Sequence, residues 1–292
     1  MADMMRSFEV LFDHAERNRL EHPAFSIYGP LGFPEPPPDR PWIFSNFVQS
    51  IDGIASLRGY HSSGADISQS AEDRWLMDLL RAHADAVLLG VNTLVEDAAV
   101  EGSRGHVYRI DDGSLLDLRA KLGRGQERNI FVTGAASLDL AAFRVFEAGE
   151  SVQPMILTTR EGRARLEQKQ THPHVKILEA GEGKFVDLIS AMRMLRQMGI
   201  RYLLCEGGPT LNGYMSRAGL IDERFITISP IEVGHIVPEQ QKRTPAEERS
   251  GERYRPTTFS APGFLKEEAP RWRWVSCRRV GDHQFHRYRR VR

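Results

Sequence analysis

Short apolar runs recur along the chain from residue 42 onward, separated by amphipathic and polar stretches. The runs at residues 86–89 and 202–205 are continuously apolar, which is typical of strands that a parallel sheet buries on both faces. The same reasoning predicts further strands at residues 42–48, 130–132, 155–157, 175–178 and 225–228. A sheet is therefore expected at the centre of the fold.

Amphipathic segments between these runs predict helices. In residues 70–82, Ser70 can cap the first turn, Asp73 lies within it, and apolar residues follow at helical spacing. Residues 185–198 predict a second helix, which Gly199 ends. The alternation of strands and helices predicts an α/β fold with a mixed, mainly parallel sheet flanked by helices.

The two ends of the chain differ from this pattern. Residues 1–22 have apolar positions at helical spacing and predict a short amphipathic helix. Five prolines among residues 33–41 require an extended connector, which we interpret as a surface strap rather than a domain linker. We therefore divide the chain into an N-terminal helix and strap at residues 1–40 and a single domain at residues 41–292.

Three segments remain within that domain. Residues 98–128 are rich in Gly, Arg and Asp and are interpreted mainly as loop, and residues 236–262 as a long polar loop. Residues 271–292 alternate and carry Gly281 and Asp282 in the middle. This pattern predicts a C-terminal antiparallel hairpin with a tight turn.

Composition and charge exclude several classes of protein. Lys plus Arg and Asp plus Glu both number 39, so the zero net charge gives no support to nucleic-acid or membrane-surface binding. The only cysteines, Cys205 and Cys277, exclude a disulfide framework and any site with three or four Cys ligands. No apolar run is long enough to span a bilayer, and charged residues interrupt the first twenty positions. We expect a cytoplasmic protein with no bound metal.

Two motifs were weighed and set aside. His14 and Glu16 match the first half of a zinc deaminase signature, but no Pro-Cys-x-x-Cys follows. Residues 271–292 hold eight Arg interleaved with aromatic residues, a combination that some single-strand nucleic-acid binders use. For a neutral chain we favour a strand pair with Arg on one face and apolar groups on the other.

Three loops that follow predicted strands carry groups suited to an anionic cofactor, which open α/β sheets bind beyond their strand ends. Gly90 and Thr93 begin a helix after a buried strand, where backbone N–H groups favour phosphate, although a Thr cap is equally common. Thr158, Thr159 and Arg160 can hold a phosphate monoester, or form an ordinary polar turn.

The third loop is residues 206–210, Glu-Gly-Gly-Pro-Thr. Gly207 and Gly208 allow a ligand to approach the backbone, and Pro209 suits the first position of a helix. A pyrophosphate would fit on that N-terminus, with Glu206 facing the reacting part of the ligand. The alternative is a tight strand-to-helix turn without a ligand.

Four stretches in this order resemble the reductase domain of bacterial riboflavin biosynthesis, the 5-amino-6-(5-phosphoribosylamino)uracil reductases. They are residues 46–53, 73–93, 205–212 and 227–234. The resemblance implies a dihydrofolate-reductase-like fold, NADPH across the strand ends and a homodimer. The residues that it implies for cofactor binding are Ser50, Gly90, Thr93, Thr158, Thr159, Arg160, Gly207, Gly208, Pro209, Thr210 and Leu211.

The resemblance also implies a substrate site. Its residues are Asn46, Asp52, Asp97 and Glu206. Two features depart from the family pattern. Asn46 stands where many members have Lys, and residues 96–101, Glu-Asp-Ala-Ala-Val-Glu, replace a segment that commonly reads Asp-Asp-Pro-x-Leu-Thr-x-Arg, of which only Asp97 can be a retained residue. Both changes remove groups that would bind a sugar phosphate.

The implied reaction is hydride transfer from NADPH to C1 of the ring-opened ribosylamino group, giving a ribitylamine. The cofactor supplies the chemistry and the protein orients the reactants. Asp52 and Glu206 are the candidate catalytic acids, and water is the alternative. Two other functions stay open: a reductase of the same fold acting on another small carbonyl, imine or pterin-like substrate, and a binding protein without catalysis.

Overall fold

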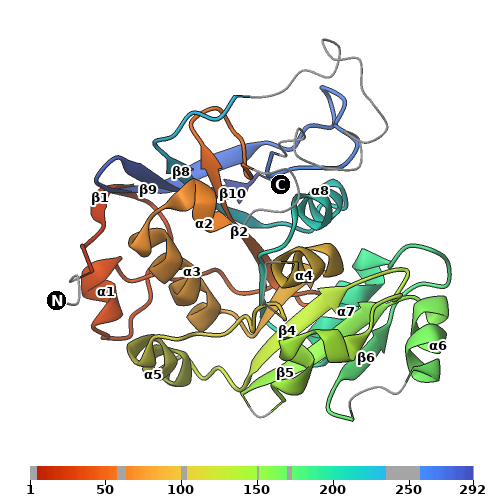
Figure 1. The fold of residues 1–292 in the computed structure, drawn as a ribbon. Coiled ribbons are helices and arrows are strands. Elements are labelled where there is room, and N and C mark those ends of the chain that lie inside the picture. The colour runs from red at the N-terminus through yellow and green to blue at the C-terminus, as the bar shows by residue number, and fades with distance from the viewer. Residues whose placement is uncertain are drawn as a thin grey trace.

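The apolar runs of the chain form the strands of one mixed sheet in the structure, a computed structural model that describes residues 5–57, 64–99, 104–149, 151–169, 173–234 and 257–291 (Figure 1). The strands are β1 (Glu9–Asp13), β2 (Trp42–Ser50), β3 (Ala86–Gly90), β4 (Glu127–Val132), β5 (Val152–Thr158), β6 (Lys176–Glu179), β7 (Tyr202–Cys205), β8 (Glu223–Ser229), β9 (Trp272–Val280) and β10 (His283–Arg290). Their order across the sheet is β1-β9-β10-β8-β2-β7-β3-β4-β5-β6.

The block from β8 to β6 is parallel, whereas β10, β9 and β1 complete the sheet as antiparallel strands. This confirms the predicted mainly parallel sheet with a C-terminal hairpin. Because parallel strands point the same way, their carboxyl ends share one edge of the sheet, where ligands of such folds bind.

Helices cover both faces of the sheet (Figure 1). They are α1 (Ala24–Ile27), α2 (Gly64–Ser68), α3 (Ala71–His83), α4 (Val91–Ala98), α5 (Gly113–Lys121), α6 (Arg160–Gln168), α7 (Leu188–Gln197) and α8 (Pro209–Arg217). One apolar core includes residues of α1, α3, α4, α5 and α6. The core on the opposite face includes residues of α7 and α8. Two short 3-10 turns lie at Leu140–Ala142 and Arg144–Glu147.

Strand residues divide between these two cores by simple alternation. On β3, Val87 and Leu89 belong to the core that contains α3, while Ala86 and Leu88 belong to the core that contains α7. Successive side chains of a strand point to opposite faces, so an uninterrupted apolar run satisfies both cores. The runs predicted from the sequence all lie within observed strands or overlap them.

The prediction of a helix over residues 1–22 is wrong. Residues Glu9–Asp13 form β1, which pairs antiparallel with β9. Ion pairs hold the two strands together, because Arg279 contacts Glu9 at 2.7 Å and Arg278 contacts Asp13 at 2.6 Å. Pairing with a strand about 270 residues away along the chain has overridden the local helical spacing.

The interpretation of residues 98–128 as mainly loop is wrong in part, because α5 and the start of β4 fall there. Asp112 caps α5 by accepting hydrogen bonds from the backbone N–H groups of Ser114 and Leu115. Most of the predicted loop at residues 236–262 lies outside the described residues. The strap at residues 33–41 contains no helix or strand, as predicted.

The arginines of the C-terminal hairpin are partners of carboxylates inside the fold. Glu223 is fully buried on β8 and contacts Arg287 and Arg289 at 2.6 Å each. Arg287 is itself buried to about the same degree, and its guanidinium also donates to the carbonyl of Gly32. These side chains therefore connect the hairpin to β8 and to the strap that precedes β2.

Candidate active site at the carboxyl edge of the sheet

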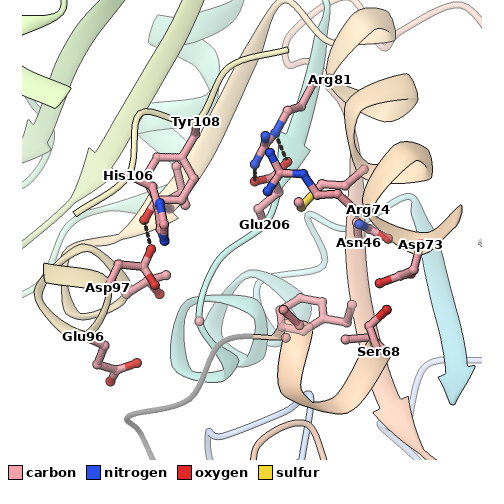
Figure 2. Close-up of a pocket in the computed structure, with 18 of the residues that line it drawn as sticks. Asn46, Ser68, Asp73, Arg74, Arg81, Glu96, Asp97, His106, Tyr108 and Glu206 are labelled. Atoms are coloured by element: carbon pink, nitrogen blue, oxygen red, sulfur yellow. Dashed lines mark hydrogen bonds and ion pairs between the residues drawn. The ribbon is translucent and has the colours of Figure 1, made fainter. Parts of the chain in front are cut away.

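A cavity of about 780 Å³ lies at the carboxyl ends of β2, β7 and β3, between α3, α4 and the segment at residues 105–111. Figure 2 shows its polar side chains in three groups. Arg81 and Glu206 lie between the other two, Asn46, Ser68 and Asp73 lie on one side, and the α4 carboxylates lie on the opposite side. A concave, mixed polar and apolar pocket at this edge is the expected ligand site of such a sheet.

The ion pair between Arg81 and Glu206 closes the inner end of the cavity. Arg81 Nε and Nη2 donate to the two carboxylate oxygens of Glu206, each at 2.7 Å, and both side chains are about 95% buried. Arg81 also contacts Asp78 at 3.1 Å and donates to the carbonyl of Arg109 at 3.0 Å. Burial alone lowers the pKa of Arg81, but Glu206 and Asp78 more than reverse this and raise it.

This geometry limits what Glu206 can do. Both of its carboxylate oxygens accept hydrogen bonds from the Arg81 guanidinium, so both are already occupied by a cationic partner. Glu206 is therefore suited to stabilise positive charge in a ligand and poorly suited to donate a proton.

Two adjacent carboxylates of α4 make one side of the cavity acidic. Burial raises the pKa of Glu96 to about 7, and the neighbouring charge of Asp97 adds to this. Burial also raises the pKa of Asp97, although its carboxylate accepts a hydrogen bond from the Tyr108 hydroxyl. Asp97 lines the cavity as predicted, but its partner Tyr108 was not foreseen.

The opposite side of the cavity contains Asp73 and Asn46. Burial raises the pKa of the Asp73 carboxyl, and the nearby hydroxyls of Thr227 and Ser68 offset only part of this. Among the residues that the structure describes, the buried Oδ1 of Asn46 has no hydrogen-bond partner. Because buried polar atoms are almost always paired, this oxygen is available to a ligand.

Arginines surround the mouth of the cavity. Arg74 contacts Asp111 at 3.4 Å and Arg109 contacts the same carboxylate at 3.1 Å, with all three side chains more than half exposed. Exposed pairs of this kind contribute about 0–1 kcal/mol, so either guanidinium can exchange its partner for a ligand anion. The sequence reasoning missed both arginines as site residues, although Arg74 lies within a stretch that carries the resemblance.

The loops after β3 and β7 meet at the edge of the cavity. The Gly90 N–H donates to the Gly207 carbonyl at 3.2 Å, and a Cβ on Gly207 would lie 3.0 Å from Leu89 Cα. A Cβ on Gly208 would lie 2.9 Å from Thr93 Oγ1, and Gly208 has a φ of +32°. Close contact between the two loops therefore requires glycine at both positions and brings the N-termini of α4 and α8 together.

The remaining predicted residues of the loop after β7 occupy the first turn of α8. Pro209 is the first helical residue and lines the cavity with Thr93 and Gly208. Thr210 is exposed, whereas Leu211 is buried in the core that contains α7. Seven of the predicted cofactor residues thus lie around one pair of helix N-termini: Gly90, Thr93, Gly207, Gly208, Pro209, Thr210 and Leu211.

Thr158, Thr159 and Arg160 do not line this cavity but lie along the same edge, at the end of β5. Thr159 caps α6 by accepting from the Gly162 N–H at 3.1 Å, and Thr158 is fully buried. The Arg160 side chain is 65% exposed and contacts Glu182 at 2.8 Å. Of the three, Arg160 has its charged group on the surface.

Asp52 and Ser50 lie outside the residues that line the cavity. Ser50 Oγ donates to the Asp52 carboxylate at 2.5 Å, and the backbone N–H groups of Val233 and Gly234 donate to it at 3.2 and 2.6 Å. The hydrogen bond from Ser50 and those from the backbone lower the pKa of Asp52. Asp52 thus connects the end of β2 to the segment after β8.

The described residues form neither a metal-binding cluster nor a membrane-spanning helix. Within the described ranges, no three His, Cys, Asp or Glu side chains are grouped so that they could hold a metal ion. In the same part of the chain, every helix is too short or too polar to cross a bilayer.

Comparison with known proteins finds consistent relatives. Residues 41–283 match the family described as the RibD C-terminal domain. The 2,5-diamino-6-ribosylamino-4(3H)-pyrimidinone 5′-phosphate reductase of Methanothermobacter thermautotrophicus is 30% identical over 196 residues, which cover 67% of this chain and 80% of that protein. The corresponding reductase of Archaeoglobus fulgidus is 27% identical over 199 residues, covering 67% of this chain and 83% of that one.

Solved structures with the same fold include a pyrimidine reductase-like protein of Corynebacterium diphtheriae, at a TM-score of 0.63 and 19% identity. The match covers 87% of this chain and 93% of that one. Acinetobacter baumannii RibD matches at a TM-score of 0.59 and 20% identity over 87% of this chain. The present chain spans only 59% of the length of that protein.

Proposed function

Because the chain belongs to the RibD C-terminal domain family, we propose that it is an NADPH-dependent reductase of riboflavin biosynthesis. The proposed reaction reduces 5-amino-6-(5-phosphoribosylamino)uracil to the ribitylamino product. The observation that carries the proposal is the 780 Å³ cavity beside the paired N-termini of α4 and α8. The relatives of this chain that are named as reductases support the assignment.

The residues at this edge fit a dinucleotide. The glycine-rich contact between the β3 and β7 loops presents two helix N-termini, which favour the negative charge of a pyrophosphate. Arg160 lies farther along the edge, where its exposed guanidinium suits the 2′-phosphate that distinguishes NADPH from NADH. The nicotinamide then belongs on the opposite side of the pyrophosphate, toward β2 and Asn46.

The substrate is assigned to the cavity itself. Arg74 and Arg109 at the mouth supply positive charge for the sugar phosphate. They compensate for Asn46, which stands where many family members have Lys, and for the missing Arg of the family segment that begins at Glu96. Asn46 Oδ1 offers an acceptor to the ring substituents. The bound cofactor supplies the hydride, and Glu206 stabilises the positive charge that develops on the substrate.

The first experiment is a fluorescence titration of the wild-type protein with NADPH and, separately, with NADH. Arg160→Ala should weaken NADPH binding about 10-fold to 100-fold and leave NADH unchanged, because a charge-assisted bond contributes about 1.5–3 kcal/mol. Arg163→Ala is the matched control, because its side chain is exposed on the same helix and contacts Glu167 at 2.8 Å. Absence of binding by either nucleotide would refute the reductase and favour a non-catalytic binding protein.

A second candidate function rests on the carboxylates of α4. Glu96 and Asp97 make one side of the cavity unsuitable for an anion, which favours a small carbonyl, imine or pterin-like substrate without phosphate. Turnover of the phosphorylated pyrimidine should be compared with turnover of its dephosphorylated form. Preference for the phosphorylated compound, lost in Arg109→Ala, supports the first function, and the opposite preference supports the second.

The assembly and location of the enzyme are also proposals. We propose a homodimer in the cytoplasm that acts on a small molecule, without a nucleic-acid or membrane partner. Light scattering after size exclusion tests the dimer, since a monomeric mass at micromolar concentration would contradict it. Retention of the protein by nucleic acid or lipid vesicles at physiological salt would contradict the absence of such partners.

A further inference from the structure

The chemistry of the proposed reduction requires a proton as well as a hydride, and the cavity holds several carboxyl groups. We propose that Asp73 is the catalytic residue that donates this proton to the substrate. The inference rests on the proposed function and assigns a residue that neither the motifs nor the comparisons single out.

The position of Asp73 supports this role. It lies in the first turn of α3 and lines the cavity beside Asn46, on the side that we assign to the nicotinamide (Figure 2). Within the described residues, no Lys or Arg forms an ion pair with its carboxyl group. Ser70 fixes the backbone at this point, because its hydroxyl accepts from the Asp73 N–H at 3.2 Å.

The groups that face Asp73 come from several elements. Ser68 of α2 and Thr227 of β8 contribute hydroxyls, and His283 of β10 also acts on the carboxyl group electrostatically. His283 Nε2 lies 2.7 Å from the carbonyl of Ser68. On α3 itself, Glu72 is occupied by Arg6 at 2.6 Å, and Arg74 is turned toward Asp111.

Burial is the largest effect on the Asp73 carboxyl and raises its pKa, so it retains a proton at a higher pH than an exposed Asp does. A proton donor needs this property near the operating pH. The raised pKa and the position in the cavity therefore both support proton donation by Asp73.

The other carboxyl groups near the site are less suitable. Both oxygens of Glu206 accept hydrogen bonds from Arg81, and Asp52 is stabilised in its charged form outside the cavity. Asp97 already accepts the Tyr108 hydroxyl hydrogen. Glu96 retains a proton to about pH 7, but it lies on the side of the cavity opposite Asn46 and Asp73 (Figure 2).

The proposed step balances as follows. The bond between C1 of the ribosyl group and its ring oxygen breaks, and the exocyclic nitrogen lone pair forms a C=N bond. The ring oxygen takes the proton from the Asp73 carboxyl group. C1 then accepts the hydride supplied by NADPH, so the substrate is reduced by two electrons while NADPH becomes NADP⁺. Asp73 regains its proton from solvent.

The experiment compares wild type with Asp73→Asn, which keeps the shape of the side chain and removes the acid. We expect kcat to fall about 10²-fold to 10⁴-fold while the Kd for NADPH stays unchanged. Wild type should lose activity as the pH rises and Asp73 loses its proton, and Asp73→Asn should not show this loss. Asp73→Glu should recover part of the rate. Asp66→Asn is the matched control, because Asp66 lies on neighbouring α2 and does not line the cavity.

A kinetic isotope effect separates proton donation from simple binding. In Asp73→Asn, ring opening should become rate-limiting. Deuteration of NADPH at the transferred position should then leave kcat nearly unchanged, so the isotope effect on kcat should approach unity. A raised KM with an undiminished isotope effect would show that Asp73 only binds the substrate and would overturn the inference.

Two further outcomes are distinguishable. If wild type turns over the substrate and Asp73→Asn retains kcat within about threefold, the inference fails and the proposed function stands. If wild type itself fails to turn over any tested substrate although it binds NADPH, the proposed function fails and Asp73 loses its role with it. Binding of NADPH by Asp73→Asn confirms that the variant is folded in both cases.

Discussion

The buried pair of Arg81 and Glu206 allows a prediction whose size follows from the contacts. Two hydrogen bonds of 2.7 Å join side chains that are 4% and 6% exposed. Removing one member of such a pair costs about 3–5 kcal/mol, because the other charge is left buried without a partner. The two substitutions considered are Glu206→Leu and Arg81→Met.

The two substitutions should reduce the free energy of unfolding by different amounts. After Glu206→Leu, Arg81 still contacts Asp78 at 3.1 Å and the Arg109 carbonyl, so the expected loss is about 3 kcal/mol. Arg81→Met leaves two buried carboxylates, Asp78 and Glu206, and should cost about 5 kcal/mol at pH 8. The double variant should cost at least about 2 kcal/mol less than the sum of the single variants.

Urea unfolding followed by tryptophan fluorescence measures these free energies from the midpoint and slope. Arg81→Met should regain stability as the pH falls, because the stranded carboxylates bind protons in the folded state before they do so in the unfolded state. Single-variant losses below about 1 kcal/mol, or strictly additive losses in the double variant, would refute a buried and coupled pair.

Three other predictions concern the surroundings of the site. Gly207→Ala should destabilise the protein by about 1–3 kcal/mol and weaken NADPH binding, because its Cβ would lie 3.0 Å from Leu89 Cα. Thermal unfolding measures the lost stability and nucleotide titration measures the Kd. An unchanged Kd would contradict the prediction. Ser70→Ala should cost about 1 kcal/mol by removing the α3 cap, seen as a lower Tm that Ser70→Asp restores. Wild type should lose stability as the pH rises from 4.5 to 7, because folding raises the pKa of Glu96 to about 7. The Tm should therefore depend less on pH in Glu96→Gln than in wild type. An identical pH dependence of Tm in the two proteins would contradict the prediction.

The central fold was predictable because local pattern and tertiary environment agree there. An uninterrupted apolar run such as residues 86–89 fits only a strand with a core on each face. Residues 9–13 lacked such agreement, because the partner that makes them a strand is β9 and nothing nearby in the sequence indicates it. The α5 helix had a usable signal in Asp112 followed by Leu115 and Leu118, which the Gly and Arg content of the segment obscured.

The close contact of the loops after β3 and β7 was predictable from Gly207 and Gly208. The strand-end hydroxyls were ambiguous, and Thr159 caps α6 outside the cavity, as one alternative interpretation of the sequence allowed. The state of the carboxylates was not predictable. The sequence contains no sign that Arg81 occupies Glu206 or that Asp52 serves to join two strand ends. Nor does it distinguish Asp73 from its neighbours, because burial by α2, β8 and β10 sets its proton affinity.

The place of β1 in the sheet has a consequence for biosynthesis. Within the described part of the chain its strand partner is β9, and Glu9 and Arg279 are 270 residues apart in sequence. At about 5–20 residues per second, a ribosome needs roughly 15–55 s to make the segment between them. During that interval the segment with Val10 and Leu11 lacks its partner strand, so a chaperone or a neighbouring nascent chain can bind it. Completion of this edge is therefore among the last events of folding, and its speed depends on translation.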